Sequence, residues 1–188
     1  MALWIKNLPG KIYKKIRFLF NEKKTWQDIE YFDEGWKERI SSMAEFIDPN
    51  VKVMDLGCGK SWLKNYLPEN CEYIPVDYIK RSAECIVADF NKKQFPQIKA
   101  DVLFVSGCLE YIKDYSWFIS KLCSHGNRII ISYCTTDEFP NWSKRKSLLW
   151  ENHLSSSILI NYFEKKGFIP VASKITKENN RIYVFERK

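Results

Sequence analysis

Short apolar runs alternate with amphipathic stretches along the chain after residue 50. The apolar runs predict strands over 51–56, 72–76, 85–88, 101–106 and 128–133. Apolar residues at helical spacing predict helices over 61–67, 114–123 and 155–166. Only eight residues separate Asp77 from Ile86, so we expect a short turn between the second and third strands.

The last part of the chain predicts a hairpin. Gly167 follows the last helix, where a left-handed cap favours glycine. Strands over 168–175 and 181–186 then flank a polar turn at 177–180. Alternating strand and helix units imply right-handed crossovers and a parallel sheet. The sequence therefore predicts an α/β fold, with a doubly wound, seven-stranded, mostly parallel sheet and one antiparallel strand from the C-terminal hairpin.

Two helices are expected before the first strand. Residues 10–22 place Ile12, Ile16, Leu19 and Phe20 on one face, with lysines mostly elsewhere. A second helix is expected over 33–47, because an Asp-Pro-Asn stop follows it at 48–50. We therefore divide the chain into 1–50, a basic amphipathic arm with a capping helix, and 51–188, a ligand-binding domain.

The net charge of +7 is concentrated in one segment. Residues 1–24 carry seven basic side chains and one acid, so the remaining 164 residues hold a net charge of only +1. Proteins that grip a nucleic-acid backbone usually spread basic residues across the binding face. We therefore expect no nucleic-acid partner.

The cysteines indicate a reducing compartment. None of the six forms a C-x-x-C pair, and most lie on or beside predicted strands, so neither a zinc site nor a disulfide framework is expected. No apolar run approaches the ~18 residues of a membrane span, and charged and turn residues interrupt the N-terminus where a signal peptide would need an apolar core. We expect a cytoplasmic protein without a metal.

The segment VKVMDLGCGKSWL at 51–63 carries the chemistry. Its strand ends in Asp55, and the turn Gly57-Cys58-Gly59 allows a ligand to approach the backbone closely. A P-loop would need glycine where Met54 stands, and a dinucleotide-binding G-x-G-x-x-G motif would need glycine where Trp62 stands. Neither phosphate-binding motif fits.

The intact DLGCG sequence closely resembles the first motif of class I S-adenosylmethionine-dependent methyltransferases, which have a Rossmann-like fold. The resemblance implies S-adenosylmethionine as the cofactor. Its amino group would face Asp55, and the backbone of Gly57, Cys58 and Gly59 would approach it closely. Ser61 departs from the pattern, since many relatives carry a third glycine there.

The same resemblance assigns the other cofactor-binding positions. Asp77, followed by Tyr78, ends the second strand and would accept hydrogen bonds from both ribose hydroxyls. Asp89 and Phe90 follow the third strand and would lie near the adenine. Ser106 and Gly107 would flank the methionyl part of the cofactor. Trp36 and Arg39 either help to cover this methionyl part or belong to a capping helix that only packs on the sheet.

The acceptor side is less defined by the sequence. Methyl transfer is an in-line displacement that needs alignment, plus a base when the acceptor is a hydroxyl. His153 is either that base or a helix-entry residue that bonds locally. The loop over 135–146 resembles an acceptor-binding lid. Glu110 and Tyr111 face either cofactor or acceptor.

The resemblance favours enzymes that O-methylate a small molecule or a sugar of a surface-glycan precursor, in polysaccharide biosynthesis. The basic arm over 1–24 either lies on the anionic inner membrane face or folds over the site. Two alternatives stay open: an RNA or protein methyltransferase, and a non-catalytic module that binds S-adenosylmethionine.

Overall fold

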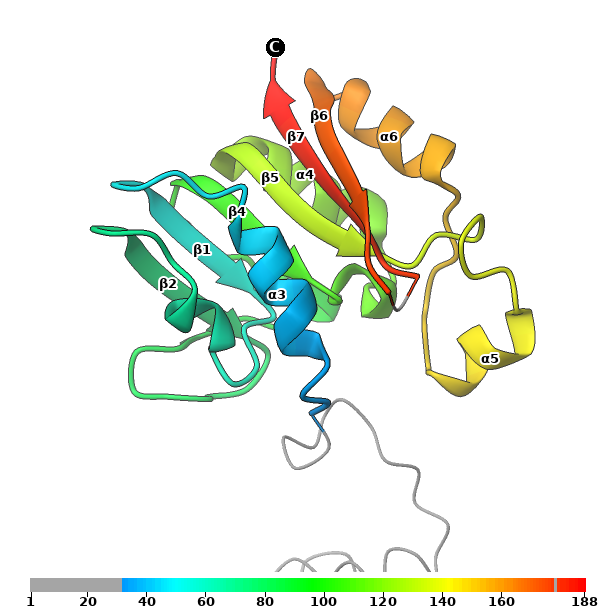
Figure 1. The fold of residues 1–188 in the computed structure, drawn as a ribbon, viewed down its shortest axis with the longest axis horizontal. Helices are drawn as coiled ribbons and strands as arrows, with labels where there is room; N and C mark the ends of the chain where they lie inside the picture. Colours follow the sequence, from blue (N-terminus) through cyan, green and yellow to red (C-terminus); the bar gives the residue numbers. More distant parts are fainter. Residues whose placement is uncertain (1–31, 178) are drawn as a thin grey trace, which may run out of the picture. The chain divides into compact units, whose positions relative to one another are not determined.

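The computed structural model describes residues 32–177 and 179–188. The helix predicted over 10–22 and the basic arm over 1–24 lie outside the described residues. Contacts divide the chain into Met1–Asp33 and Glu34–Lys188, and the fold is that of the second unit. Its seven strands form one sheet in the order β3-β2-β1-β4-β5-β7-β6 (Figure 1).

The sheet is parallel except for one strand. The strands are β1 (Lys52–Leu56), β2 (Glu72–Asp77), β3 (Ile86–Val87), β4 (Ala100–Ser106), β5 (Gly126–Tyr133), β6 (Phe168–Ile175) and β7 (Arg181–Arg187). β7 runs antiparallel to both of its neighbours, β5 and β6. The predicted mostly parallel sheet with one antiparallel strand from the C-terminal hairpin is confirmed.

Helices cover both faces of the sheet, as the doubly wound prediction requires. The α-helices are α3 (Trp36–Ala44), α4 (Tyr115–His125), α5 (Trp142–Ser147) and α6 (Ser156–Glu164). In Figure 1, α3 lies on one face, while α4 and α6 lie on the other. Short 3-10 turns are η2 (Trp62–Asn65), η3 (Phe90–Lys92) and η4 (Leu109–Tyr111).

Strand alternation divides the core into two clusters, one for each face. Along β4, Leu103 and Val105 pack with residues of α4 and α6, whereas Val102 and Phe104 pack with residues of α3. All four side chains are at most 2% exposed. This is the two-residue period expected of a strand covered on both sides.

Two local predictions were wrong. The helix expected over 61–67 is only the 3-10 turn η2, because Ser61 adopts a left-handed conformation with φ of 55°. The predicted loop over 135–146 contains the start of α5. Figure 1 shows α5 set apart from the sheet, beyond the end of β5.

Four of the parallel strands end at the edge of the sheet where the predicted site residues lie. β1, β2, β4 and β5 finish at Leu56, Asp77, Ser106 and Tyr133. The connections that leave this edge carry nearly all the predicted site residues, so the topology gathers them. None of the helices within residues 32–177 and 179–188 is long and apolar enough to cross a bilayer.

Candidate active site

The glycine turn after β1 is held close to two neighbouring segments. Gly57 and Gly59 have φ of 84° and 52°, values that suit glycine. The amides of Gly57 and Cys58 both donate to the carbonyl oxygen of Val76, at 2.8 and 3.0 Å. A Cβ atom on Gly57 would lie 2.9 Å from the Sγ of Cys108, so this position has no room for a side chain.

Asp55 is a buried carboxyl group near the end of β1. It is 4% exposed, and the hydroxyl of Tyr73 donates a hydrogen bond to its Oδ2 at 2.7 Å. Burial raises the pKa of Asp55 to about 7; the Tyr73 hydrogen bond opposes this rise and the charge of Asp77 adds to it. A cationic group of a ligand beside Asp55 would offset the free-energy cost of burying the carboxylate in its charged form.

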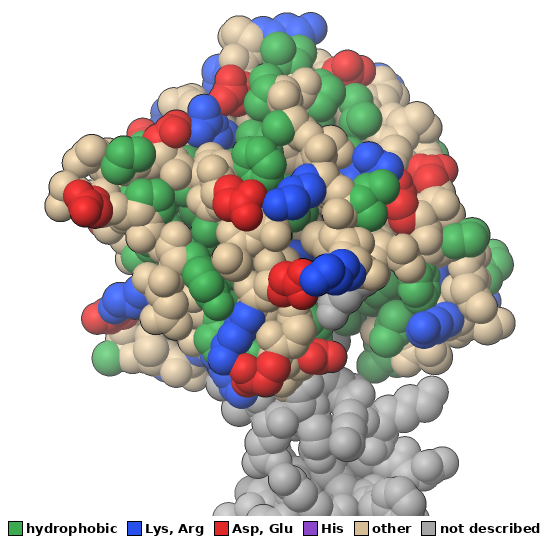
Figure 2. Space-filling model, in the orientation of Figure 1, with side chains coloured by type: hydrophobic (Ala, Val, Ile, Leu, Met, Phe, Trp, Pro, Cys, Tyr) green, Lys and Arg blue, Asp and Glu red, His purple; other side chains and the backbone are tan. Residues whose placement is uncertain are grey.

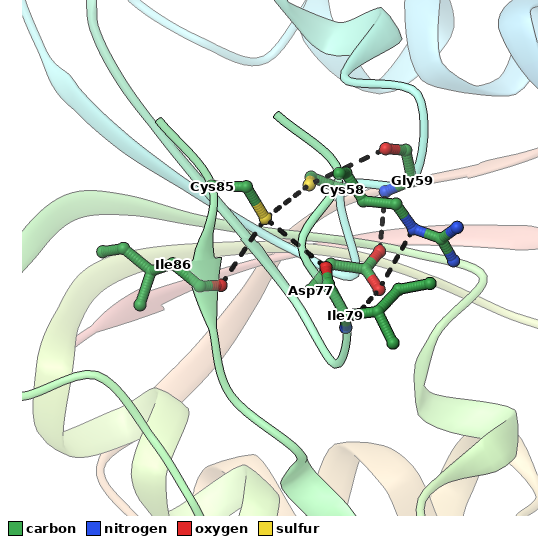
Figure 3. A network of polar contacts seen from close by, with 7 residues as sticks. Cys58, Gly59, Asp77, Ile79, Cys85 and Ile86 are labelled. Carbon is green, nitrogen blue, oxygen red and sulfur yellow. Dashed lines mark hydrogen bonds and ion pairs between the residues drawn. The ribbon is translucent and has the colours of Figure 1, made fainter. Parts of the chain in front are cut away.

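Asp77 links the second strand to the glycine turn. The Gly59 amide donates to its Oδ2 at 2.9 Å, and Oδ1 pairs with the Nε of Arg81 at 3.4 Å. Figure 3 shows the carboxylate lying between Gly59 and Ile79. Tyr78, the next predicted residue, has its ring 5.6 Å from the guanidinium carbon of Arg81.

Two buried thiols lie behind the turn. The Sγ atoms of Cys58 and Cys85 are 4.0 Å apart, and both side chains are buried (Figure 3). Burial raises the pKa of the Cys58 thiol far above its usual range. Both cysteines therefore act as small apolar packing residues.

The segment after β4 is held by helix α3. Arg39, 7% exposed, donates from Nε to the hydroxyl oxygen of Ser106 at 3.0 Å. The Gly107 amide donates to the hydroxyl oxygen of Ser132 at 2.9 Å. The Trp36 ring centre lies 5.7 Å from the guanidinium carbon of Arg39. The predicted residues Trp36 and Ser106 are thus connected through Arg39, whereas Gly107 bonds to Ser132.

The two residues predicted near the adenine have different surroundings. Asp89 caps η3 by accepting a hydrogen bond from the Asn91 amide at 3.0 Å. The Phe90 ring packs in the core, 4.9 Å from the Phe118 ring between centres. The Phe90 side chain is therefore a core residue.

A second polar network at the same edge was not predicted from the sequence. Glu110, 2% exposed, accepts a hydrogen bond from the Cys134 amide at 3.0 Å and so joins the segments after β4 and β5. Burial raises the pKa of Glu110. Hydrogen bonds from the backbone of Glu110 and Cys134, and then the charges of Arg39 and Arg145, partly offset this rise. Arg145, which belongs to the predicted acceptor-binding lid over 135–146, is fully buried.

The Asn152 side chain ties the loop before α6 to the segment after β4. Its amide nitrogen donates to the carbonyl oxygens of Leu109 and Ile112, at 2.6 and 2.9 Å. Its oxygen accepts a hydrogen bond from Tyr133 at 2.7 Å. No periodicity or motif in the sequence indicates the side chains of this network, because each is a single polar residue among unrelated neighbours.

His153 belongs to this second network. Its Nδ1 accepts a hydrogen bond from the Nε of Arg145 at 3.0 Å. The Trp142 ring packs edge-on against the imidazole, with centres 4.2 Å apart. Burial and the charges of Arg145 and Lys146 lower the pKa of His153. Its role as a base stays a prediction.

The opposite edge of the sheet has a cavity of about 280 Å³. His125 lines it, and none of the predicted site residues does. Within the described part of the chain, no group of three or more His, Cys, Asp or Glu side chains could hold a metal ion.

Two solved structures share this arrangement of elements. The 1,6-didemethyltoxoflavin-N1-methyltransferase of Burkholderia thailandensis has a TM-score of 0.66 and 14% identity, over 96% of this chain and 91% of that one. The magnesium protoporphyrin IX methyltransferase of Synechocystis PCC 6803 has a TM-score of 0.65 and 16% identity, over 95% of both chains. Both were solved with S-adenosylhomocysteine bound. The chain has the class I S-adenosylmethionine-dependent methyltransferase fold, as the DLGCG motif predicted.

A sequence relative points to the same class. Phosphoethanolamine N-methyltransferase 3 of Arabidopsis thaliana is 27% identical over an alignment of 137 positions that covers 58% of this chain. The chain spans only 28% of the length of that relative. No protein-family model matches the chain.

Proposed function

We propose that this chain is an S-adenosylmethionine-dependent methyltransferase. One observation carries the proposal: the buried acids Asp55 and Asp77 flank a glycine turn at the carboxyl edge of a sheet with the methyltransferase fold. Asp55 would receive the amino group of the cofactor, and Asp77 the ribose hydroxyls. Gly57, Cys58 and Gly59 would form the floor, while Ser106 and Gly107 would lie beside the methionyl part.

The cofactor is already activated when it binds, so the protein mainly supplies alignment. The buried, hydrogen-bonded setting of both acids means that their positions are fixed before a ligand arrives. In the proposed complex the acceptor approaches from the side of Glu110, Tyr133 and Arg145, because this second network lies at the ends of β4 and β5. Loop 135–146, with the start of α5, would border that approach.

For the acceptor, we propose a hydroxyl of a small molecule or of a sugar in a surface-glycan precursor. The two solved structures are named for small acceptors, 1,6-didemethyltoxoflavin and magnesium protoporphyrin IX, which supports a small acceptor here. Figure 2 shows acidic and basic side chains interspersed over one face of the described part, with no continuous basic surface there. This mixture fits the expectation that nucleic acid is not the acceptor.

Location and membrane contact are part of the same proposal. A cytoplasmic enzyme with a basic arm over 1–24 would work beside the inner membrane face, where precursors of surface glycans are lipid-linked. Liposome co-sedimentation of the full chain, compared with a chain lacking residues 1–24, tests the contact. Equal sedimentation of the two would leave the arm only the role of a cover for the site.

Calorimetry with S-adenosylhomocysteine tests the cofactor site. We expect Asp77→Ala to weaken binding by at least tenfold, about 1.4 kcal/mol, because the ribose hydroxyls lose their acceptor. Glu164→Ala, which removes an exposed acid on α6, is the control and should bind normally. Absence of binding by the unaltered protein would refute the proposal. Binding without turnover of nucleotide sugars, lipid-linked glycans or small alcohols would favour the non-catalytic module.

A further inference from the structure

Arg145 is a rigid buried cation that determines how His153 is held. Its guanidinium donates to the carbonyl oxygens of Cys134, Thr135 and Phe139, at 2.9, 3.2 and 3.1 Å. The indole of Trp150 covers it, with the ring centre 4.8 Å from the guanidinium carbon. Arginine stays protonated in proteins, so its Nε is always a donor. The nitrogen of His153 that faces it must accept.

This contact fixes the tautomer of His153. Since Nδ1 accepts the Arg145 hydrogen bond at 3.0 Å, a neutral imidazole carries its proton on Nε2. Burial, and then the charges of Arg145 and Lys146, lower the pKa of His153 from its ordinary value, which favours the neutral ring at pH 7. Within residues 32–177 and 179–188, Nε2 has no hydrogen-bond partner, so a donor is available to a ligand.

We infer that the Nε2–H of His153 binds an anionic oxygen of the methyl acceptor, a phosphoryl or carboxylate oxygen, and that the positive charge of Lys146 on α5 favours this binding. This inference rests on the proposed methyltransferase function and replaces the base predicted for His153 with a hydrogen-bond donor. A base needs a free lone pair, and the lone pair on Nδ1 is already used by Arg145. Trp142, 55% exposed, supplies an aromatic wall beside the imidazole.

The surrounding chain places this subsite on the acceptor side. The amide of Glu151 donates to the carbonyl oxygen of Glu110 at 2.7 Å, and Asn152 bonds to the same segment. His153 therefore directly follows residues fixed against the connection that leaves β4 beside Ser106. An acceptor held here would lie over the carboxyl edge of the sheet, with its other end free to reach the methyl group.

The charges around the subsite favour an anion. Residues 139–150 contain Lys144, Arg145 and Lys146 and no acid. The acids that precede them are engaged elsewhere: Asp137 accepts from the Ser156 amide at 2.6 Å, and Glu138 from Arg181 at 2.6 Å. The remaining nearby acids are Glu151, which is exposed to solvent, and the buried Glu110, whose pKa is raised by burial. Positive charge therefore dominates α5 and its connection to His153.

NMR measures the tautomer without any assay of activity. The chain has two histidines, so two-bond proton–nitrogen correlation spectra contain one set of imidazole signals for each. The set that is missing from the His153→Asn variant belongs to His153. We expect His153 to show the Nε2–H tautomer at pH 8 and at pH 7, and Arg145→Gln to raise the pH at which its ring titrates. His125 serves as the internal control. An Nδ1–H tautomer or a protonated ring at pH 7 would overturn the inference.

Anion titrations measure the subsite. In the full chain saturated with S-adenosylhomocysteine, inorganic phosphate and acetate should each shift the Nε2–H signal saturably, and sodium chloride at equal ionic strength should not. The stronger of the two identifies the ligand class. We expect Lys146→Gln to weaken the shift at least tenfold and the exposed control Lys165→Gln to leave it unchanged.

Conservative replacement separates a donor from a packing residue. His153→Gln places an amide N–H near the position of Nε2 and should retain anion binding, measured through the Lys146 side-chain signal, whereas His153→Ala should lose it. Equal shifts with phosphate and chloride would overturn the inference. If S-adenosylhomocysteine binds and neither anion does, the subsite alone fails; if S-adenosylhomocysteine does not bind, the proposed function fails.

Discussion

The buried carboxyl group of Asp55 has opposite effects on the stability of the free protein and on its affinity for a cationic ligand. A carboxyl group that is 4% exposed prefers to be neutral, and its pKa of about 7 reflects that preference. A cationic ligand group reverses it, because the charge is then paired inside the protein. The same residue therefore opposes stability in the free protein and contributes to affinity for the proposed cofactor.

We predict that affinity for S-adenosylhomocysteine falls as pH drops below 7. Asp55 must lose a proton to pair with the amino group, so below its pKa of about 7 binding weakens by up to about tenfold per pH unit. Calorimetry between pH 8 and 5.5 measures this slope. Asp55→Asn should bind weakly with a flat profile, and an identical slope in that variant would contradict the assignment.

We predict the opposite effect of Asp55→Asn on stability. The pKa of Asp55 is raised from 3.8 to about 7 in the fold, so its destabilising contribution develops as pH rises between these values and is complete above pH 7. At pH 8 the variant should unfold with a free energy higher by up to about 4 kcal/mol. Urea unfolding of the variant and the unaltered chain at pH 8 and pH 4 tests this prediction. A gain in unfolding free energy that is as large at pH 4 as at pH 8 would contradict it.

Gly57 and Gly167 allow the cost of backbone strain to be separated from the cost of a steric clash with a neighbouring side chain. Both have left-handed φ, 84° and 79°, but a Cβ on Gly57 meets Cys108 at 2.9 Å, whereas one on Gly167 meets no atom within 4 Å. Gly167→Ala should therefore cost about 1 kcal/mol from backbone strain alone. Gly57→Ala should cost at least twice that in urea unfolding and weaken S-adenosylhomocysteine binding. Equal losses of unfolding free energy in the two variants would show that the Cys108 side chain moves away from the added methyl group without cost.

Elements with a regular apolar pattern were predictable, and elements held by polar groups were not. The strand expected over 51–56 is β1 (Lys52–Leu56), because apolar side chains there fill both faces of the sheet. α5 has no apolar stripe, since its buried side chain is Arg145, so periodicity could not reveal it. The helix expected over 61–67 failed on a backbone angle at Ser61 that composition does not encode.

The same distinction applies to the candidate site. Acids at strand ends follow from the motif and its spacing. In the structure, Asp55 accepts a hydrogen bond from Tyr73, and Asp77 accepts one from the amide of Gly59 in the glycine turn. The network of Glu110, Tyr133, Arg145 and Asn152 depends on long-range hydrogen bonds between segments that the sequence leaves unconnected. Only the folded sheet brings them to one edge.

Arg145 should be essential for the segment that contains α5. Arg145→Ala would leave three backbone carbonyls without their donor and a cavity under Trp150, so we predict a loss of about 2–4 kcal/mol in unfolding free energy. Lys146→Ala, on the same helix but exposed, should change it by less than about 0.5 kcal/mol. Similar losses in urea unfolding would show that Arg145 is not a structural anchor.

The core of the molecule lies in one unit, which leads to a prediction about truncation. The buried residues of both apolar clusters fall between Met43 and Phe185, so the unit Glu34–Lys188 contains the whole described core. We predict that a chain lacking residues 1–31 unfolds cooperatively, with a midpoint within a few degrees of that of the full chain. Calorimetric scanning measures this, and S-adenosylhomocysteine should raise both midpoints equally because Asp55 and Asp77 remain in place. A truncated chain that folds but gains no stability from the ligand would show that residues 1–31 complete the cofactor site, and the arm would then be a cover for the site.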